Sequence, residues 1–286
     1  MLLAVVLLLP FPAPALELRD DTGHSLHLAQ PATRIVPLYG AITELICAMG
    51  LEDRLIGRTD ADARVEELHA VQHLPSTGTH LRPNTERIVS LRPDLILQMI
   101  GRQDSLEQVE RLRRMGLPVA AFHLRTLDDV LRLADWLGEA LGAPEKARAL
   151  RENCVARLDA VQQRIRRDVP PPRVFFEVRY PNLLAAGQDA FVDDVIRLAG
   201  GVNVVSVPGR VARLNEEELL RLNPDVYVYQ RGPMNPAPSF PGERGHYGVL
   251  SAVRQGRVLE VNEQIFSRPG PRAVQAVEQL AAFLWP

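Results

Sequence analysis

Arginine and tyrosine side chains stand directly after several predicted strands, where they are placed to bind a ligand. In parallel α/β sheets, ligands gather at the carboxyl ends of the strands and at the amino ends of the helices that follow. Guanidinium groups at these positions suit anionic partners, such as carboxylate, hydroxamate or catecholate oxygens. For any single arginine, the alternative is a solvated side chain or a pair with a neighbouring carboxylate. The selected residues, with one loop histidine, are Tyr39, Arg58, Thr59, His80, Arg102, Arg179, Tyr180, Gln230, Arg231 and Arg268.

An internal repeat carries one glutamate in each half of the chain. Residues 84–97 align without gaps on residues 215–228, so every counterpart lies 131 positions further along the chain. In each copy an asparagine is placed to cap a short helix, and Leu-x-Pro-Asp leads from that helix into a strand. The glutamates are Glu86 and Glu217, and the helix dipole alone would also explain an acid in a first helical turn. Two copies predict two lobes of similar plan, each with a surface glutamate.

His69 and His73 form the pair whose spacing suits a metal ion. Four residues apart on a predicted helix, their imidazoles would share one face, and His80, His123 and His246 are further candidates. A pair supplies at most half of a four-ligand shell, so a solvated helix face is the simpler interpretation and we predict no metal held by the protein alone.

Motifs of hydrolytic enzymes are absent from the sequence. The chain contains no Gly-x-Ser-x-Gly motif, no cysteine beside a candidate histidine and no phosphate-binding glycine loop after a strand. We therefore predict that the protein is not an enzyme, and an exported hydrolase is the disfavoured alternative.

Alternating strands and helices must position these side chains. The expected strands are 34–38, 54–57, 94–99, 118–122, 173–178, 183–186, 202–206, 225–230 and 257–261. The expected helices are 41–49, 85–92, 104–115, 126–141, 190–199, 216–222, 248–254 and 270–284. This alternation is typical of βαβ units with parallel sheets.

One long helix is predicted near the middle of the chain. Residues 144–168 contain no glycine or proline after Pro144, which suits a first helical turn, and the prolines at 170–172 enforce a stop. Apolar residues recur along it at spacings of three and four, and its length would be about 37 Å. Its place between the two halves indicates a helical connection between two lobes.

The overall composition is that of a globular protein. The chain has 286 residues, of which 46% are hydrophobic and 24% charged, and its net charge is −2. Such a charge gives no field that would attract nucleic acid, and 5% aromatic residues argue against a stacking platform for single strands. Lys146 is the only lysine, so nearly every cation is an arginine.

The first fifteen residues predict export. Residues 2–9 are an apolar run too short for a membrane span, and Ala13-x-Ala15 follows as a cleavage signature, so we expect a signal peptide over residues 1–15 and a periplasmic location. No cysteine follows the run, which predicts a protein that is not a lipoprotein. Cys47 and Cys154 lie in predicted helices and are expected to be unpaired core residues.

Motifs spread over residues 17–284 resemble those of substrate-binding proteins of ABC importers for iron chelates, haem and vitamin B12. They include Thr43-Glu44-Leu45-Ile46 before Met49-Gly50, both Leu-x-Pro-Asp segments, Leu198-Ala199-Gly200-Gly201-Val202-Asn203 and Arg268-Pro269-Gly270-Pro271-Arg272. Each motif alone is moderate evidence, but in this order the set is specific.

The resemblance implies an α/β fold of two Rossmann-like lobes with mostly parallel central sheets, joined by one long interlobe α-helix. The lobes would span residues 16–142 and 170–286, with the linking helix at 143–169, and the ligand would lie in the cleft between them. Glu86 and Glu217 would dock on arginines of an inner-membrane ABC permease. Closure on the ligand would be small, because a helix is a stiff connection.

The sequence does not decide which ligand is bound. We expect a metal chelate of the ferric-siderophore, haem or cobalamin type, bound by a monomer with no resident cofactor. Low aromatic content weighs against cobalamin, although the Arg268–Arg272 motif resembles that of cobalamin-type members. The alternatives are a bare Zn or Mn ion and an oxyanion such as molybdate. We also predict that the proline-rich loop 232–242 closes over the cleft.

Overall fold

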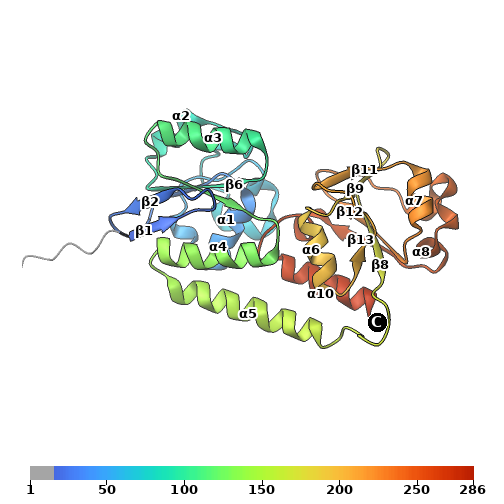
Figure 1. The fold of residues 1–286 in the computed structure, drawn as a ribbon. Helices are drawn as coiled ribbons and strands as arrows, with labels where there is room; N and C mark the ends of the chain where they lie inside the picture. Colours follow the sequence, from blue (N-terminus) through green and yellow to red (C-terminus); the bar gives the residue numbers. More distant parts are fainter. Residues whose placement is uncertain (1–15) are drawn as a thin grey trace, which may run out of the picture.

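Two α/β lobes lie side by side in the computed structural model, which describes residues 16–286 (Figure 1). The predicted signal peptide at residues 1–15 lies outside the described residues. The fold class predicted from the sequence is confirmed: each lobe has a sheet with a parallel core and helices on both faces. In the described part of the chain, no helix is both long and apolar enough to cross a membrane.

The first lobe is built on a three-stranded parallel sheet in the order β3-β6-β7. All six residues of the central strand β6 are buried, as expected for a strand that is covered on both faces. Helices α2 and α3 cover one face, and α1 and α4 cover the other. The bounds are β3 (Ile35–Pro37), β6 (Leu95–Ile100), β7 (Val119–His123), α1 (Gly40–Ala48), α2 (Thr85–Leu91), α3 (Gln103–Arg114) and α4 (Leu127–Ala140).

The second lobe has a larger, mixed sheet in the order β11-β9-β8-β12-β13, with β10 paired to the start of β8. Strands β8, β12 and β13 are parallel, whereas β9 and β11 run antiparallel at one edge. The strands are β8 (Arg173–Arg179), β9 (Leu184–Ala186), β10 (Val202–Asn203), β11 (Val211–Arg213), β12 (Val226–Arg231) and β13 (Val258–Asn262). The helices are α6 (Phe191–Leu198), α7 (Glu216–Leu222), α8 (Ser251–Arg254), α9 (Glu263–Phe266) and α10 (Ala273–Leu284).

The long helix between the lobes is shorter than the sequence predicts. Helix α5 spans Pro144–Gln162, about 28 Å, and does not continue to residue 168. Its last residue, Gln162, donates from Nε2 to the carbonyl of Leu198 (2.9 Å), and Ile165 packs against Gly200. Contacts with the second lobe thus end the helix, although its sequence has no breaker there. Helix α5 lies beneath both lobes and packs on α4 of the first and α10 of the second (Figure 1).

Each copy of the repeat builds the same helix-to-strand corner. The side chains of Asn84 and Asn215 accept from the third backbone N–H of α2 and α7, at 3.0 and 2.8 Å. At the other end, Arg34, just before β3, and Arg173, the first residue of β8, donate to the carbonyls of the last residue of α2 and α7 and of the residue that follows it. The two lobes therefore share not only the aligned segments but also the hydrogen bonds from Arg34 and Arg173, which lie outside those segments.

One apolar core runs through both lobes. Buried residues of α4 and α5 belong to the same cluster as those of α6 and α10, with Leu137, Cys154, Ile196 and Leu280 among them. Cys47 and Cys154 are unpaired thiols, and burial raises the pKa of Cys47 to about 12. The lobes are thus joined by packing as well as by the chain.

Some predicted strands are reduced to isolated bridges or short segments. Residues 54–57 contribute only a single bridge, between Leu55 and Ile35, and residues 202–206 form only the two-residue β10. Two antiparallel hairpins were not predicted: β1 (Leu16–Arg19) with β2 (Ser25–Leu28), and β4 (Gly78–Thr79) with β5 (Arg82–Pro83). These edge elements are too short for periodicity to reveal.

Candidate functional site: the interlobe cavity

A cavity of about 580 Å³ lies between the two lobes. The first lobe contributes residues at the start of α1, in the loop after β3 and at the end of β6, and the second lobe contributes the segments around residues 210, 233 and 264. Five of the residues selected from the sequence meet here although they are far apart in the chain, namely Tyr39, Thr59, His80, Arg102 and Arg268. The cavity falls within the size range typical of sites for small molecules.

A second cavity of about 830 Å³ adjoins the first. The two cavities share Met99, Gly101, Arg102 and Arg210, so these four residues stand where they meet. Its remaining lining comes from the turn between β1 and β2, from the residues after β7, from the start of α3 and from Asp189 and Gly209 of the second lobe. We refer to the two together as the interlobe cavity.

Tyr39 and His80 form an edge-to-face pair in its wall. Their ring centroids are 5.6 Å apart and their planes are inclined by 79°. Burial raises the pKa of the Tyr39 phenol, while Arg210 and Arg268 act in the opposite direction. Partial burial lowers the pKa of His80, and the nearby charges of Arg210 and Arg102 add to that effect. Both shifts in pKa favour the uncharged form of the ring.

A network of ion pairs joins the lobes, and one of its residues, Arg268, lines the cavity. Arg268 and Arg272 lie between α9 and α10 of the second lobe, and they bind carboxylates of the first. Arg268 lies 3.1 Å from Asp62 and 3.4 Å from Glu44, while Arg272 contacts Glu44 at 2.9 Å and Glu67 at 2.6 Å. We call these five residues the interlobe ion-pair network.

Fully buried Asp62 has the donors that a buried charge requires. Besides Arg268, its carboxylate accepts from the backbone N–H and Oγ1 of Thr59 (2.8 and 2.9 Å) and from Oγ1 of Thr43 (3.0 Å). Gly40 makes the approach of Arg268 possible, because a Cβ there would collide with its guanidinium and with Asp62. Arg268 and Thr59 therefore line the cavity while Nη1 and Nη2 of Arg268 and the hydroxyl of Thr59 already donate hydrogen bonds within the protein.

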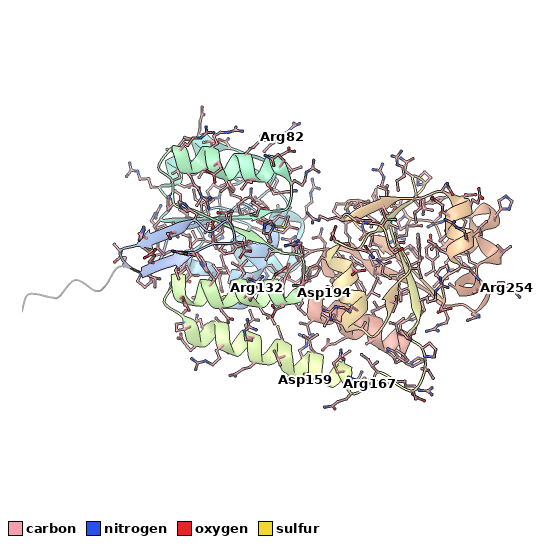
Figure 2. The ribbon with its side chains drawn as sticks, viewed as in Figure 1. Arg82, Arg132, Asp159, Arg167, Asp194 and Arg254 are labelled. Carbon is pink, nitrogen blue, oxygen red and sulfur yellow. The ribbon has the colours of Figure 1, made fainter. Side chains whose placement is uncertain are left out.

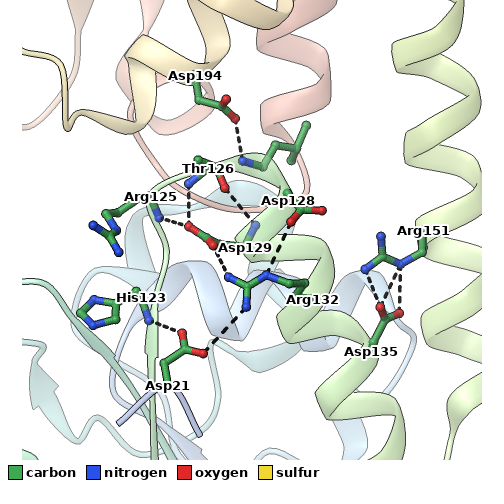
Figure 3. Close-up of polar contacts among 11 residues, drawn as sticks. Asp21, His123, Arg125, Thr126, Asp128, Asp129, Arg132, Asp135, Arg151 and Asp194 are labelled. Carbon is green, nitrogen blue, oxygen red and sulfur yellow. Dashed lines mark hydrogen bonds and ion pairs between the residues drawn. The ribbon is translucent and has the colours of Figure 1, made fainter.

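A second connection between the lobes lies at the start of α4. Asp194 of α6 accepts from the backbone N–H of Leu127 at 2.8 Å, which satisfies one of the free donors at that helix end. Figure 2 shows Asp194 at the junction of the lobes, and Figure 3 shows it above the turn that Thr126 and Asp129 cap. Asp21, from the turn after β1, holds the backbone N–H of His123 nearby at 2.7 Å.

Five of the selected residues do not line the interlobe cavity, and three of these are bound to neighbours in their own lobes. Arg58 donates to the backbone carbonyls of Gln72 and Thr59, and exposed Arg231 is paired with Glu260 at 2.6 Å. The buried amide of Gln230 donates to the carbonyl of Val178 and accepts from Ser267 Oγ. All three residues lie at or near the end of a strand or bridge, as predicted, but each side chain binds a neighbour in its own lobe instead of facing the cavity.

Arg179 and Tyr180 line a separate pocket of about 470 Å³ on the second lobe. Its other wall is the segment 233–237, and Met234 lines both this pocket and the interlobe cavity. The Tyr180 ring lies under the guanidinium of Arg244, 4.0 Å from its centroid, and Arg244 is ion-paired with buried Glu177. The first residues of the predicted flap thus reach the cavity, and Arg244 fastens the end of that loop to the sheet.

Glu86 and Glu217 are both exposed in the first turns of α2 and α7. Neither forms an ion pair with another of residues 16–286. Helix α2 lies at the top of the first lobe and α7 on the outer part of the second (Figure 1). Their carboxylates are thus available to a partner.

Arg210 is the most prominent cavity residue that the sequence rule missed. It precedes β11 instead of following a strand, so the rule of strand ends did not select it. Arg64, Ser105, Glu263 and Gln264 also line the cavity and were not selected. The turn signal Pro208-Gly209 before Arg210 was the one local sign of an ordered loop.

No cluster of three or more metal-ligating side chains is found among residues 16–286. His69 lies in a short 3-10 turn, Glu66–Val71, that ends before His73, so the predicted helix that would put both imidazoles on one face does not form.

Residues 35–279 match the model of a protein family described as periplasmic binding protein. The ABC transporter substrate-binding lipoprotein YvrC of Bacillus subtilis, whose name calls it uncharacterized, is 26% identical over 93% of this chain and 84% of its own length. The vitamin B12-binding protein of Vibrio cholerae is 26% identical over 89% of this chain and 90% of its own. The solved apo structure of the periplasmic heme-binding protein RhuT from Roseiflexus sp. RS-1 superposes with a TM-score of 0.71 at 26% identity, covering 89% of this chain and 98% of that one.

One prediction from the sequence is corrected by these relatives. We expected a periplasmic protein that is not a lipoprotein, on the ground that no cysteine follows the apolar N-terminal run. That prediction is wrong: the Bacillus relative, which aligns over 93% of this chain, is named a lipoprotein.

Proposed function

The chain belongs to the periplasmic binding protein family, and we propose that it captures a metal chelate of the ferric-siderophore, haem or cobalamin type in the interlobe cavity. Its relatives are substrate-binding proteins of transporters, so this protein is a binding protein and not an enzyme. The names of two relatives, a vitamin B12-binding and a heme-binding protein, support a large metal-containing ligand.

The interlobe cavity is the observation that carries the proposal. Its two parts, about 580 and 830 Å³, provide room for a ligand the size of a chelate, between walls from both lobes. Aliphatic side chains such as Leu81, Met99, Leu106 and Met234 alternate there with arginines and hydroxyl groups. A mixed wall of this kind suits a ligand with an apolar body and polar edges.

A thermal-shift screen tests this function. The purified protein is heated with ferric siderophores, haemin, cyanocobalamin, molybdate, Zn²⁺ or Mn²⁺. A ligand present at 100 times its dissociation constant stabilises the folded state by about 2.7 kcal/mol. Stabilisation by a chelate is the expected result, whereas stabilisation by molybdate or stoichiometric binding of a bare ion would replace the proposal with one of the two alternatives.

We further propose that Glu86 and Glu217 deliver the ligand by docking on an ABC permease. Support comes from their equivalent places in the repeat, their exposure and the absence of ion pairs with other described residues.

Charge reversal at the two glutamates distinguishes delivery of the ligand to the permease from capture of the ligand in the cavity. Glu86→Arg with Glu217→Arg should abolish uptake of the ligand by cells and leave its affinity for the purified protein unchanged. Glu145→Arg is the matched control, since Glu145 is also an exposed acid in a first helical turn, that of α5. Loss of affinity in parallel with uptake, or equal loss of uptake in the control, would refute the docking role.

A further inference from the structure

Arg210 is held at the junction of the two cavity parts by a rigid turn. The segment 207–210 runs against residues 187–189 and is joined to them by three backbone hydrogen bonds of 3.0 to 3.3 Å. The carboxylate of Asp189 also accepts from the backbone N–H of Gly209 at 2.7 Å. Gly187 permits the close approach, because a Cβ there would collide with the carbonyl oxygens of Val207 and Gly209.

From this turn the Arg210 side chain crosses to the other lobe. Its Nη1 atom lies 3.3 Å from the position that a Cβ on Gly101 would occupy. Gly101 is followed by Arg102, which lines the same two cavity parts. Two guanidinium groups from opposite lobes thus face one space, and the pKa of His80 responds to both.

These two arginines differ from Arg268, which also lines the cavity, in the carboxylates that bind them. Arg268 is 10% exposed and has two carboxylate partners in the first lobe. Arg210 has no ion pair among residues 16–286, and Arg102 has only an exposed contact of 3.5 Å with Asp104. Arg210 therefore has no carboxylate partner there and Arg102 has only a solvent-exposed one, and an anion bound between them would offset the repulsion between their charges.

The acids of the cavity wall are already engaged as hydrogen-bond acceptors. Asp60 accepts from Ser76, Glu263 from the backbone N–H of Met234, and Asp21 and Asp189 from the backbone N–H groups given above. Burial raises the pKa of Glu263, and its hydrogen bond from Met234 counters this. None of the four forms an ion pair with Arg102 or Arg210.

We propose that Arg102 and Arg210 form an anion clamp that binds a carboxylate of the ligand between the lobes. The inference rests on the proposed function and narrows it to chelates that carry carboxylates. Such a group at the junction would accept from both guanidiniums, with the body of the chelate against Met99, Leu106 and Met234. A chelate whose periphery holds only amides offers no charge to the clamp.

The test compares chelates with and without carboxylates on the same protein. Haemin and ferric citrate carry carboxylates, whereas ferrichrome has no free carboxylate and cyanocobalamin carries amides and one phosphodiester but no carboxylate. Affinity is measured by titration for the unaltered protein and for Arg102→Gln and Arg210→Gln. We expect a carboxylate chelate to bind, and each variant to weaken it by about tenfold or more. Arg231→Gln and Arg179→Gln, which remove arginines outside the interlobe cavity, should leave the affinity unchanged.

The outcomes separate the clamp from the proposed function. Tight binding of cyanocobalamin or ferrichrome alone would overturn the clamp and leave chelate capture standing. A carboxylate chelate whose affinity is the same in all variants would do likewise. Binding of no chelate would refute the proposed function, and the clamp with it.

Discussion

At the scale of single residues, the charged side chains at the interlobe cavity differ in whether the protein itself supplies their binding partners. Asp62 is fully buried and accepts hydrogen bonds from Thr43, Thr59 and Arg268, while Arg102 and Arg210 line the cavity. His80 lies near Arg210 and Arg102, and the charges of both arginines lower its pKa in addition to the effect of burial. Its ring is close enough to Tyr39 for edge-to-face contact, so its environment is part of the cavity wall.

The titration of His80 should therefore depend on Arg210. The folded state lowers the pKa of His80 through partial burial and then through Arg210 and Arg102, so the neutral form is favoured. This contribution to stability is fully present above the ordinary pKa of about 6.5 and is lost as pH falls through that value towards the lower, folded-state one. Arg210→Gln should move the pKa of His80 up towards its ordinary value in an NMR titration. An unchanged titration curve would place Arg210 away from His80, and Arg231→Gln serves as the control.

Gly40 gives a second prediction at this scale. Gly40→Ala puts a methyl group into the space of the Arg268 guanidinium and of Asp62, so we expect a loss of about 1–3 kcal/mol in the free energy of unfolding. Gly248→Ala is the matched control: nothing lies within 4 Å of its added Cβ, and its cost should be within about 0.5 kcal/mol. Equal effects in urea denaturation would show that Arg268 does not pack on Gly40.

At the scale of elements, short motifs join parts of the chain that are far apart. The loop between α9 and α10 carries Arg268 and Arg272 to carboxylates of α1 and of the 3-10 turns near residues 62 and 67. The motif Arg268-Pro269-Gly270-Pro271-Arg272, which the sequence singled out for its resemblance, thus belongs to the connection between lobes. Glu44 is buried, so removal of its partner leaves an uncompensated charge.

Breaking the interlobe ion-pair network should cost stability. Arg272→Gln leaves the buried carboxylate of Glu44 with Arg268 alone, at 3.4 Å, and we expect a loss of about 3 kcal/mol in the free energy of unfolding. Arg231→Gln removes the exposed arginine paired with Glu260 and should leave that free energy unchanged. The network would not be a structural tie if urea denaturation gave the same midpoint for both variants.

The elements were largely predictable from sequence, whereas the partners of individual side chains were not. Periodicity located β6, β8 and β12 and the helices around them to within a few residues. Periodicity did not predict where α5 ends. Gln162 and Ile165 contact the second lobe there, and a contact between distant parts of the chain leaves no local sequence pattern. The rule that ligands bind at strand ends also selected Gln230 and Arg231, but the side chains of both are bound to neighbours in the same lobe. Arg210 was missed because its position depends on the turn that residues 187–189 hold.

At the scale of the whole molecule, the lobes are joined by more than the linking helix. A common apolar core passes through α4, α5, α6 and α10, and the interlobe ion-pair network and the contact of Asp194 with α4 lie on the same interface. Opening of the lobes would expose this core and separate buried charges from their partners. The relative position of the lobes is therefore set largely in advance of ligand binding.

Small-angle X-ray scattering tests this rigidity. The radius of gyration of the unliganded protein should agree with that of the ligand-saturated protein within the precision of the measurement. Arg272→Gln, which weakens the interlobe ion-pair network, is the variant in which an expanded unliganded form is most expected. A clear compaction of the unaltered protein on binding would contradict a preset cavity.

The central claim is that a metal chelate binds in the interlobe cavity, and one titration tests it most directly. A bulky side chain at Ala61, an exposed residue that lines the cavity, should block the ligand, whereas the same change at Ala237 fills only the neighbouring pocket of the second lobe. With the chelate that the thermal-shift screen selects, isothermal titration calorimetry should show stoichiometric binding for the unaltered protein and for Ala237→Trp, and none for Ala61→Trp. Undiminished binding by Ala61→Trp would contradict the account.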